Sequence, residues 1–341
     1  MQPIRLGVIG MGLIWIRAHK PLLETLTDTF VPVAFADMSA ERRAAVAREF
    51  PDAQVFSEYR DLLALPEVDA VLVLTPIALN APIAEAALLA GKHVIMEKPI
   101  ARSVAEGQAL IASAQRVGRW LCVLEQMAYR QAETMLAETI AAGTIGTLVL
   151  WNRVLHLQAA PAPGPLDYES TTWRKQADFP LGTMFDGGIH LIASLTKTFG
   201  APEMVAATGR KLQPEYGEYD HVAALLQYPH GVTGMLSYSS YLPTAQNHFI
   251  VYGTAGVIVV ERERMTIERP GQPDQVVALP PEDAQQRMWQ ALQQAFRAQT
   301  PPFYTPEKAL HDVAILEAID QSIKAIEQGV AVAPVLSAGE R

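Results

Sequence analysis

The sequence predicts an α/β protein with an N-terminal doubly wound parallel sheet and a second α/β domain whose sheet is mostly antiparallel. The chain has 341 residues, which corresponds to about two domains at roughly 150 residues each. Short apolar runs alternate with amphipathic stretches over the first third, as in a parallel sheet covered on both faces. Longer β-rich runs follow one another after residue 126, as in antiparallel pairing. We therefore expect one domain over 1–125 and another over 126–341.

The elements follow from these patterns in chain order. The first strand is the apolar run Ile4–Ile9, which ends in glycines and passes into an amphipathic helix. The same unit then repeats. Further strands are expected at 31–36, 55–56, 69–74, 93–96 and 120–124, with helices at 13–26, 40–49, 81–89 and 104–117. In the second half, strands are expected at 147–157, 222–228, 231–241, 249–252 and 257–260, helices at 186–198, 282–299 and 307–328, and an Ala/Pro/Gly-rich loop at 159–165.

Composition and charge exclude several classes of function. Charged residues make up 18% of the chain and hydrophobic residues 50%, so the chain folds around apolar cores. The net charge of −9 leaves no basic surplus for phosphates, and nucleic acid is not an expected partner. The single cysteine, Cys122, excludes an intramolecular disulfide and a multi-cysteine metal site, and we expect no metal. No apolar stretch reads as a membrane span or a cleaved signal, so a cytoplasmic location without a membrane partner is expected.

A glycine-rich turn stands where the first strand passes into the first helix. Gly10 allows a tight turn, and Gly12 lets a pyrophosphate approach the backbone N–H groups at the helix start, so Leu13 and Ile14 are expected to bind cofactor. Two glycines alone also occur in ordinary turns. Turns that bind dinucleotides often follow the pattern Gly-x-Gly-x-x-Gly/Ala, in which the last small residue lets the helix pack close to the strand. Trp15 stands at that last position, so its side chain must point elsewhere or hold the helix further from the strand.

Asp37 ends the second expected strand, where an acidic side chain accepts hydrogen bonds from an adenosine ribose. A carboxylate there repels a 2′-phosphate, which favours NAD and makes NADP the less favoured cofactor. The alternative is that Asp37 caps the following helix. The two roles can coexist.

Two further pairs of residues carry candidate chemistry. Glu97 and Lys98 follow a buried strand at the sheet edge where doubly wound proteins bind ligands, and a lysine there can stabilise charge on a reacting oxygen. Asp186 and His190 are four residues apart, so on one helix they share a face, and the histidine can accept a proton near neutral pH. The alternatives are a surface ion pair for the first pair, and a helix cap with a core histidine for the second.

Several short motifs occur together over nearly the whole chain. They are Gly7–Gly12 with His19 and Leu22, Thr75-Pro76, Ala90-Gly91-Lys92-His93-Val94, Glu97-Lys98-Pro99, Gly143–Gly146, Trp173-Arg174, Asp186-x-Gly188-x-His190, and Gly253–Gly256. With these motifs the chain resembles the glucose–fructose oxidoreductase, inositol dehydrogenase and MocA (Gfo/Idh/MocA) family of NAD(P)-dependent oxidoreductases. The resemblance implies a Rossmann domain and a substrate domain whose open sheet often forms the subunit interface.

The resemblance also implies roles for individual residues. Lys98 would contact the substrate hydroxyl, His190 would be the general base, and Asp186 would hold the substrate. Thr75, Pro76, Asn80 and Glu97 would lie along the cofactor, and a cis bond before Pro99 agrees with the small cis penalty of proline. Asn80, where many relatives carry histidine, and Ala193, in place of an aspartate, depart from the family pattern.

The expected activity is the oxidation of a secondary alcohol of a sugar, polyol or related polar ring, with hydride transfer to nicotinamide. Trp173, Arg174 and Tyr129 are candidate pocket residues; the alternative for them is an aromatic core and a surface arginine. Two other functions stay open. The enzyme could retain NAD through an internal redox cycle as an epimerase, lyase or glycosidase, or the chain could be a non-catalytic dinucleotide sensor. The apolar β-rich half predicts a homodimer or homotetramer.

Overall fold

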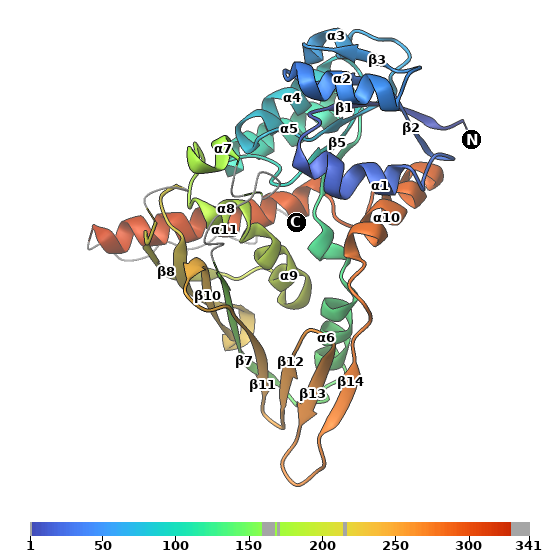
Figure 1. Ribbon diagram of the computed structural model, residues 1–341. Helices are drawn as coiled ribbons and strands as arrows, with labels where there is room; N and C mark the ends of the chain where they lie inside the picture. The colour runs from blue at the N-terminus through green and yellow to red at the C-terminus, as the bar shows by residue number, and fades with distance from the viewer. Residues whose placement is uncertain (1, 159–167, 169–170, 214–216, 329–341) are drawn as a thin grey trace. The chain divides into compact units, whose positions relative to one another are not determined.

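The computed structural model describes residues 2–158, 168, 171–213 and 217–328 (Figure 1). The loop expected at 159–165 lies outside these residues. The chain forms two compact units, one of Met1–Tyr129 with Ala284–Leu310 and one of Arg130–Asp283 with His311–Arg341. The first unit thus takes in a segment from far along the chain. The division expected between residues 1–125 and 126–341 stays a prediction.

The first unit contains a six-stranded parallel sheet in the order β3-β2-β1-β4-β5-β6. Its strands are β1 (Ile4–Ile9), β2 (Phe30–Ala36), β3 (Gln54–Phe56), β4 (Ala70–Val73), β5 (His93–Glu97) and β6 (Leu121–Leu124). The expected parallel sheet is confirmed. The order reverses between β1 and β4, and open α/β sheets typically bind ligands at the carboxyl ends of the strands on either side of such a reversal.

The helices of the first unit include two that the sequence does not predict, α3 and η2. In chain order, the helices are η1 (Trp15–His19), α1 (Lys20–Leu23), α2 (Ala40–Glu49), α3 (Tyr59–Leu63), α4 (Ile77–Leu89), α5 (Val104–Val117), η2 (Gln126–Tyr129) and α10 (Ala284–Ala298). The helix expected over 13–26 is confirmed from Leu13 to Leu23, where helical structure is continuous, but its middle, η1, is a π-helix and it ends three residues early. Trp15 is 2% exposed and its ring packs edge-on against Phe35 at 5.7 Å, so its bulk lies in the core.

Helix α10 completes the core of the first unit. Its side chains Met288, Trp289, Leu292 and Phe296 belong to the same buried cluster as the strand residues of the sheet. The rings of Trp289 and Phe296 each lie 5.5 Å from the ring of Phe30 on β2, in edge-to-face contacts. Such aromatic pairs contribute about 0.5–1.5 kcal/mol beyond the area that they bury.

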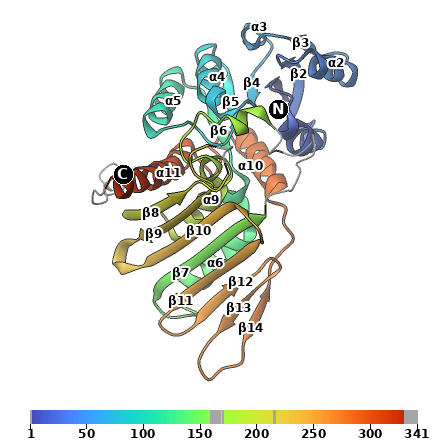
Figure 2. The ribbon, with the colours of Figure 1, turned by 60° about the vertical axis from the view of Figure 1, so that its left-hand side comes forward.

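The second unit contains an eight-stranded sheet in the order β14-β13-β12-β11-β7-β10-β9-β8 (Figure 2). Its strands are β7 (Leu148–Gln158), β8 (Met204–Arg210), β9 (His221–Gln227), β10 (Thr233–Leu242), β11 (Gln246–Gly253), β12 (Val257–Val260), β13 (Arg264–Glu268) and β14 (Gln275–Ala278). Among these described strands, β7 and β10 pair in parallel and the other neighbours pair antiparallel. The sheet is therefore mixed and mostly antiparallel, as expected.

The helices of the second unit are α6 (Gln131–Ala141), α7 (Thr172–Lys175), α8 (Thr183–Asp186), α9 (Ile189–Phe199) and most of α11 (Pro306–Glu327). The helix expected over 186–198 is divided in two, because Gly187 and Gly188 separate α8 from α9. On α11, the Ser322 hydroxyl accepts the Ala207 N–H of β8 at 2.8 Å. Within the described part of the chain, no helix is long and apolar enough to cross a membrane.

Candidate functional site

The predicted cofactor residues of the first unit stand at one edge of its sheet. Gly10 follows β1, Asp37 follows β2, Thr75 and Pro76 lie between β4 and α4, and Glu97 ends β5. Because all six strands are parallel, these positions share the carboxyl edge of the sheet. The second unit holds the remaining candidates, apart from Tyr129.

The two glycines of the turn after β1 differ in the space around them. Gly10 has a φ of +93°, and a Cβ there would lie 2.6 Å from the Leu74 carbonyl oxygen, so only glycine fits. A Cβ on Gly12 would meet nothing nearer than Arg42 Nη1 at 3.8 Å. The backbone at Gly12 is thus open to a phosphate group. Leu13 and Ile14 follow it and lead directly into η1.

The Asp37 side chain is 7% exposed, and its hydrogen bonds link the turn after β1 to the segment before α2. Its Oδ2 accepts the Met11 N–H at 2.7 Å and its Oδ1 accepts the Ser39 N–H at 2.8 Å. The N-cap of α2 is Ser39, so the alternative in which Asp37 itself caps this helix is wrong. Arg42 Nη1 lies 3.5 Å from Oδ2, which places a cation beside the carboxylate.

Asn80 connects the ends of β4 and β5. It is 1% exposed, accepts a hydrogen bond from Thr75 Oγ1 at 2.9 Å, and donates to the Glu97 carbonyl oxygen at 3.3 Å. The amide therefore braces the edge of the sheet from within. Its contact with a cofactor stays a prediction, as does that of Thr75 and Pro76.

Glu97 takes part in a buried hydrogen-bonded chain. Its Oε1 lies 2.8 Å from Nε2 of His19, and Trp289 Nε1 donates to the other ring nitrogen of His19 at 3.1 Å. Its Oε2 accepts the Lys98 N–H at 3.1 Å. The Lys98–Pro99 peptide bond is cis, as the family resemblance implies. The sequence brings in His19 only through that resemblance, and no motif points to Trp289.

Tyr129 lies in the first unit against the segment after α10. Its hydroxyl accepts the Tyr304 N–H at 3.3 Å, and its ring packs edge-on against Phe303 at 6.1 Å. Burial raises the pKa of Tyr129 to about 12. The phenol thus stays protonated at neutral pH and supports the chain locally; its contact with substrate stays a prediction.

In the second unit the structure brings Trp173, Arg174 and Asp186 together. Arg174 Nε donates to Asp186 Oδ2 at 2.5 Å, and the guanidinium carbon lies 4.1 Å from the centre of the Trp173 ring. The Tyr168 ring lies 5.1 Å from the same carbon. His190 stands in the first turn of α9. Asp186 thus belongs to an arginine-centred cluster, and its orientation of His190 stays a prediction.

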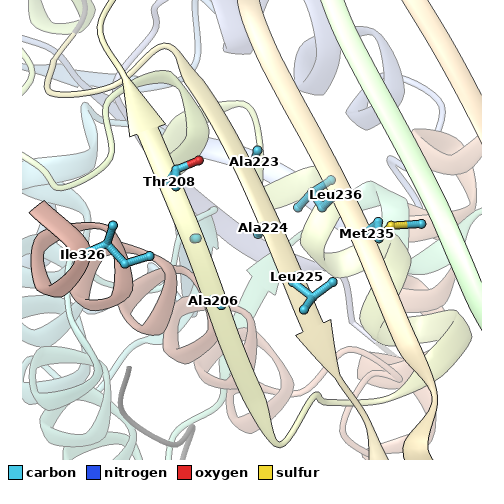
Figure 3. Close-up of a pocket in the computed structure, with 9 residues that line it drawn as sticks. Ala206, Thr208, Ala223, Ala224, Leu225, Met235, Leu236 and Ile326 are labelled. Carbon is cyan, nitrogen blue, oxygen red and sulfur yellow. The ribbon is translucent and has the colours of Figure 1, made fainter. Parts of the chain in front are cut away.

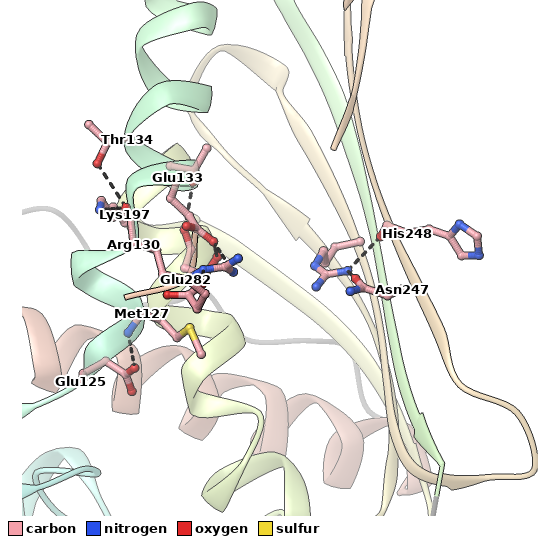
Figure 4. Close-up of polar contacts among 12 residues, drawn as sticks. Glu125, Met127, Arg130, Glu133, Thr134, Lys197, Asn247, His248 and Glu282 are labelled. Carbon is pink, nitrogen blue, oxygen red and sulfur yellow. Dashed lines mark hydrogen bonds and ion pairs between the residues drawn. The ribbon is translucent and has the colours of Figure 1, made fainter. Parts of the chain in front are cut away.

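Helix α9, which carries His190, is fastened to α6 by polar contacts (Figure 4). Ser194 of α9 donates to Glu133 Oε1 at 2.7 Å, and Arg130 Nη1 donates to the same oxygen at 2.9 Å. Lys197 Nζ donates to the Arg130 carbonyl oxygen at 2.5 Å. These bonds fix α9 against its neighbour, and so fix the backbone of His190 within the second unit.

No group of histidine, cysteine, aspartate and glutamate in the residues that the structure describes is arranged to hold a metal ion. Cys122 is buried, and burial raises the pKa of its thiol to about 12. A thiol held protonated in this way is a poor nucleophile and a poor metal ligand.

Two family models match the chain. Residues 4–125 match the model of an oxidoreductase family with an NAD-binding Rossmann fold, and residues 134–259 match the GFO/IDH/MocA C-terminal domain. Trans-1,2-dihydrobenzene-1,2-diol dehydrogenase from Mus musculus is 30% identical over 76% of this chain and 75% of its own length. The scyllo-inositol 2-dehydrogenase (NADP(+)) of Bacillus subtilis is 28% identical over 65% of this chain and 60% of its own.

Solved structures agree with these matches. An oxidoreductase from Thermotoga maritima has a TM-score of 0.87 and 27% identity, covering 94% of this chain and 97% of its own. A 3-ketoreductase from Actinomadura kijaniata, solved with NADP and TDP-benzene, has a TM-score of 0.80 and 26% identity, covering 93% and 97%. The two domain models, the mouse relative and the glycine turn with its open Gly12 agree: the chain belongs to the GFO/IDH/MocA family of oxidoreductases, with an NAD-binding Rossmann domain.

Proposed function

We propose that the protein oxidises a secondary alcohol of a sugar, polyol or related polar ring with a nicotinamide dinucleotide. The observation that carries this proposal is the carboxyl edge of the first sheet, where the open Gly12 backbone and Asp37 stand on one side and Glu97 with Lys98 on the other. Relatives support the substrate class, since those named above include a scyllo-inositol 2-dehydrogenase and a 3-ketoreductase solved with NADP and TDP-benzene.

Each candidate residue has a distinct role in this proposal. Gly10, Gly12, Leu13 and Ile14 hold the pyrophosphate through backbone N–H groups, and Asp37 lies at the adenosine ribose. The nicotinamide, when bound, supplies the acceptor for the hydride of the alcohol carbon. The Lys98 ammonium donates a hydrogen bond to the reacting oxygen and stabilises its developing negative charge. His190 accepts the hydroxyl proton at a ring nitrogen.

The Arg174 cluster serves substrate binding in this proposal. Asp186 offers carboxylate oxygens to ring hydroxyls, and Arg174 holds that carboxylate in place. Trp173 lies beside the guanidinium and provides an apolar face of the kind that packs against a sugar ring. A ring with several hydroxyl groups suits such a site, because it offers both donors and apolar C–H faces.

NAD is the favoured cofactor, with NADP second. The Asp37 carboxylate repels a 2′-phosphate, while Arg42 beside it partly offsets that repulsion.

A direct test incubates the purified protein with sugars, inositols and sugar acids, and with either dinucleotide, while NADH or NADPH is followed at 340 nm. Net reduction with at least one polyol supports the proposal. Turnover without net reduction favours an internal redox cycle, and dinucleotide binding without any turnover favours a sensor.

The open face of the second sheet supports assembly into a homodimer or homotetramer. Met204, Leu225 and Met235 on this face are 44%, 48% and 40% exposed. An apolar pocket of about 350 Å³ lies there beside the end of α11 (Figure 3). It is lined by Ala206, Ala207, Thr208, Ala223, Ala224, Leu225, Met235, Leu236 and Ile326. A second copy that covers this face would remove the exposed apolar surface from water. Sedimentation of a 37.2 kDa particle at micromolar concentration would contradict this assembly.

A further inference from the structure

Three side chains from distant parts of the chain meet inside the first unit. His19 comes from the π-helix η1, Glu97 from the end of β5, and Trp289 from α10. The side chains of His19 and Trp289 are both fully buried, whereas the Glu97 side chain is 12% exposed. Glu97 thus lies between an enclosed pair and the edge where ligands bind, and the proposed function gives no role to His19 or Trp289.

The direction of the hydrogen bonds follows from the donors. The indole N–H of Trp289 can only donate, so Nδ1 of His19 is the acceptor of the 3.1 Å bond. The hydrogen of the imidazole is therefore on Nε2, which donates to Glu97 Oε1 at 2.8 Å. If the proton were on Nδ1, it would point at the indole N–H of Trp289, and two donors would face each other without an acceptor. The chain of bonds thus presents a donor to Glu97 and fits its ionised form.

The Glu97 carboxylate is held at both oxygens. His19 donates to Oε1, and the Lys98 backbone N–H donates to Oε2. Two such bonds fix the rotation of the carboxylate. The carboxylate also precedes Lys98, so the same bonds fix the backbone from which the lysine side chain projects.

For a dinucleotide bound across the glycine turn in the usual way of such sheets, the strand order would put Glu97 on the nicotinamide side. Asp37 marks the adenosine side at β2, and Gly10 and Gly12 mark the pyrophosphate after β1. In the order β2-β1-β4-β5, the other half of a dinucleotide that crosses the glycine turn extends over β4 and β5. The oxidised nicotinamide ring carries a positive charge and the reduced ring carries none. A fixed carboxylate at the end of β5 therefore interacts differently with the two forms.

We propose that His19 and Trp289 are positioning residues that hold Glu97 as an oriented carboxylate beside the nicotinamide half, so that this edge binds the oxidised dinucleotide in preference to the reduced one. The proposal rests on the proposed use of a nicotinamide cofactor. It gives a physical cause for a preference between the oxidised and reduced forms of the cofactor. It also assigns a role to two residues that the proposed function does not use. His19 and Trp289 act through Glu97.

The test measures the dissociation constants of NAD+ and NADH by calorimetry for the purified full chain and three variants. Glu97→Gln keeps the size of the side chain and removes its charge. Trp289→Phe keeps an aromatic ring against Phe30 and removes the N–H donor. His19→Gln removes the imidazole. We expect Glu97→Gln to lower the preference for NAD+ over NADH about tenfold, and the other two variants to lower it about threefold.

A spectroscopic readout and a matched control separate positioning from general damage. Nitrogen-15 NMR of the His19 ring should show hydrogen on Nε2 in the wild type and a mixture of tautomers in Trp289→Phe. His93→Gln is the control, because His93 lies at the other end of β5 and its Nδ1 accepts the Trp120 N–H at 3.0 Å. It should leave the preference for NAD+ unchanged.

The outcomes distinguish this proposal from the proposed function. An unchanged preference in Glu97→Gln, or a preference and tautomer in Trp289→Phe equal to those of the wild type, overturns the positioning role while cofactor use stands. A wild-type protein that binds neither NAD+ nor NADH overturns the proposed function and the positioning role together.

Discussion

The Asp37 carboxylate accepts a hydrogen bond from the Met11 backbone N–H at 2.7 Å, which joins the end of β2 to the glycine turn after β1. The same carboxylate lies 3.5 Å from the Arg42 guanidinium. One side chain therefore supports the turn proposed to hold the pyrophosphate, and it also carries the charge at the position proposed for the ribose. Replacing it changes both properties at once.

We expect Asp37→Ser to weaken NAD binding about tenfold and to move the preference toward NADP. The substitution removes the carboxylate that repels a 2′-phosphate and leaves Arg42 and Arg43 near that position. Calorimetry with both dinucleotides measures the change. Asp37→Ser combined with Arg42→Ala should lose the gain for NADP. If Asp37→Ser keeps the wild-type ratio of the two affinities, the assignment of Asp37 to the ribose is wrong.

The two glycines of the turn should respond differently to the same substitution. Gly10→Ala forces a Cβ to within 2.6 Å of a backbone oxygen at a φ of +93°, and should destabilise the unit by about 2 kcal/mol or more. Gly12→Ala meets nothing within 3.8 Å and should fold normally, yet bind NAD at least tenfold more weakly. Thermal unfolding and calorimetry separate the two effects. Equal thermal midpoints would contradict the first expectation.

Lys98→Ala and His190→Ala should each lower kcat by about 10²–10⁴-fold, because each removes a group that acts on the reacting oxygen or its proton. NADH formation at 340 nm measures the loss, and calorimetry should show that His190→Ala keeps its NAD affinity. His230→Asn is the control: His230 is exposed at a φ of +63°, a conformation that asparagine also adopts. Full activity in His190→Ala would remove this residue from the mechanism.

Arg174→Ala should raise KM for the substrate about tenfold while kcat changes less. The substitution removes the 2.5 Å bond that holds Asp186, and this carboxylate then loses its orientation. Steady-state kinetics on the best alcohol substrate measures both constants. Arg264→Ala is a matched control, because Arg264 forms an exposed pair with Glu261 and such pairs contribute little. A large fall in kcat at constant KM would place Arg174 in the chemical step instead.

His93 should make stability depend on pH below neutrality. Burial, and then the Arg119 charge, lower the pKa of His93 from its ordinary value of 6.5. The unfolded chain therefore binds a proton that the folded chain does not, and stability falls as pH drops from 6.5 toward the lowered pKa. Denaturant unfolding at pH 7.5 and at pH 5.5 measures this loss, and His93→Gln should reduce it. A loss of equal size in His93→Gln would assign the effect to other groups.

The strands and helices of the first unit could largely be predicted from local sequence. Helix α5 begins and ends as expected, because Ser103 caps its start by accepting the Glu106 N–H and Gly118 ends it at a φ of +63°. Strand β8 is absent from the prediction, since Met204–Arg210 contains two alanines and a glycine, which have low strand propensity. Its pairing with β9 supplies what the local sequence lacks.

The residues of the candidate site also differ in whether the local sequence predicts where they lie. The positions of Gly10, Gly12 and Asp37 at the carboxyl edge of the sheet could be predicted, because they depend on a strand, a turn and a helix that adjoin in the sequence, whereas their roles stay predictions. The partnership of His19 with Trp289 could not, since 270 positions separate them and neither periodicity nor spacing connects them. The single helix through Asp186 and His190 is a wrong expectation, because a four-residue spacing does not show that two glycines between the residues end one helix and begin another.

Helix α10 is synthesised long after the strands that it covers. Met288, Trp289, Leu292 and Phe296 fill the interior beside strands that leave the ribosome more than 150 residues earlier. Until this helix emerges, the nascent nucleotide-binding fold leaves Phe30 and its neighbours uncovered, and such surfaces bind chaperones or associate with one another. Translation must therefore proceed beyond residue 298 before the core around β1–β6 can close, and a product truncated before residue 284 would lack the helix that completes this core.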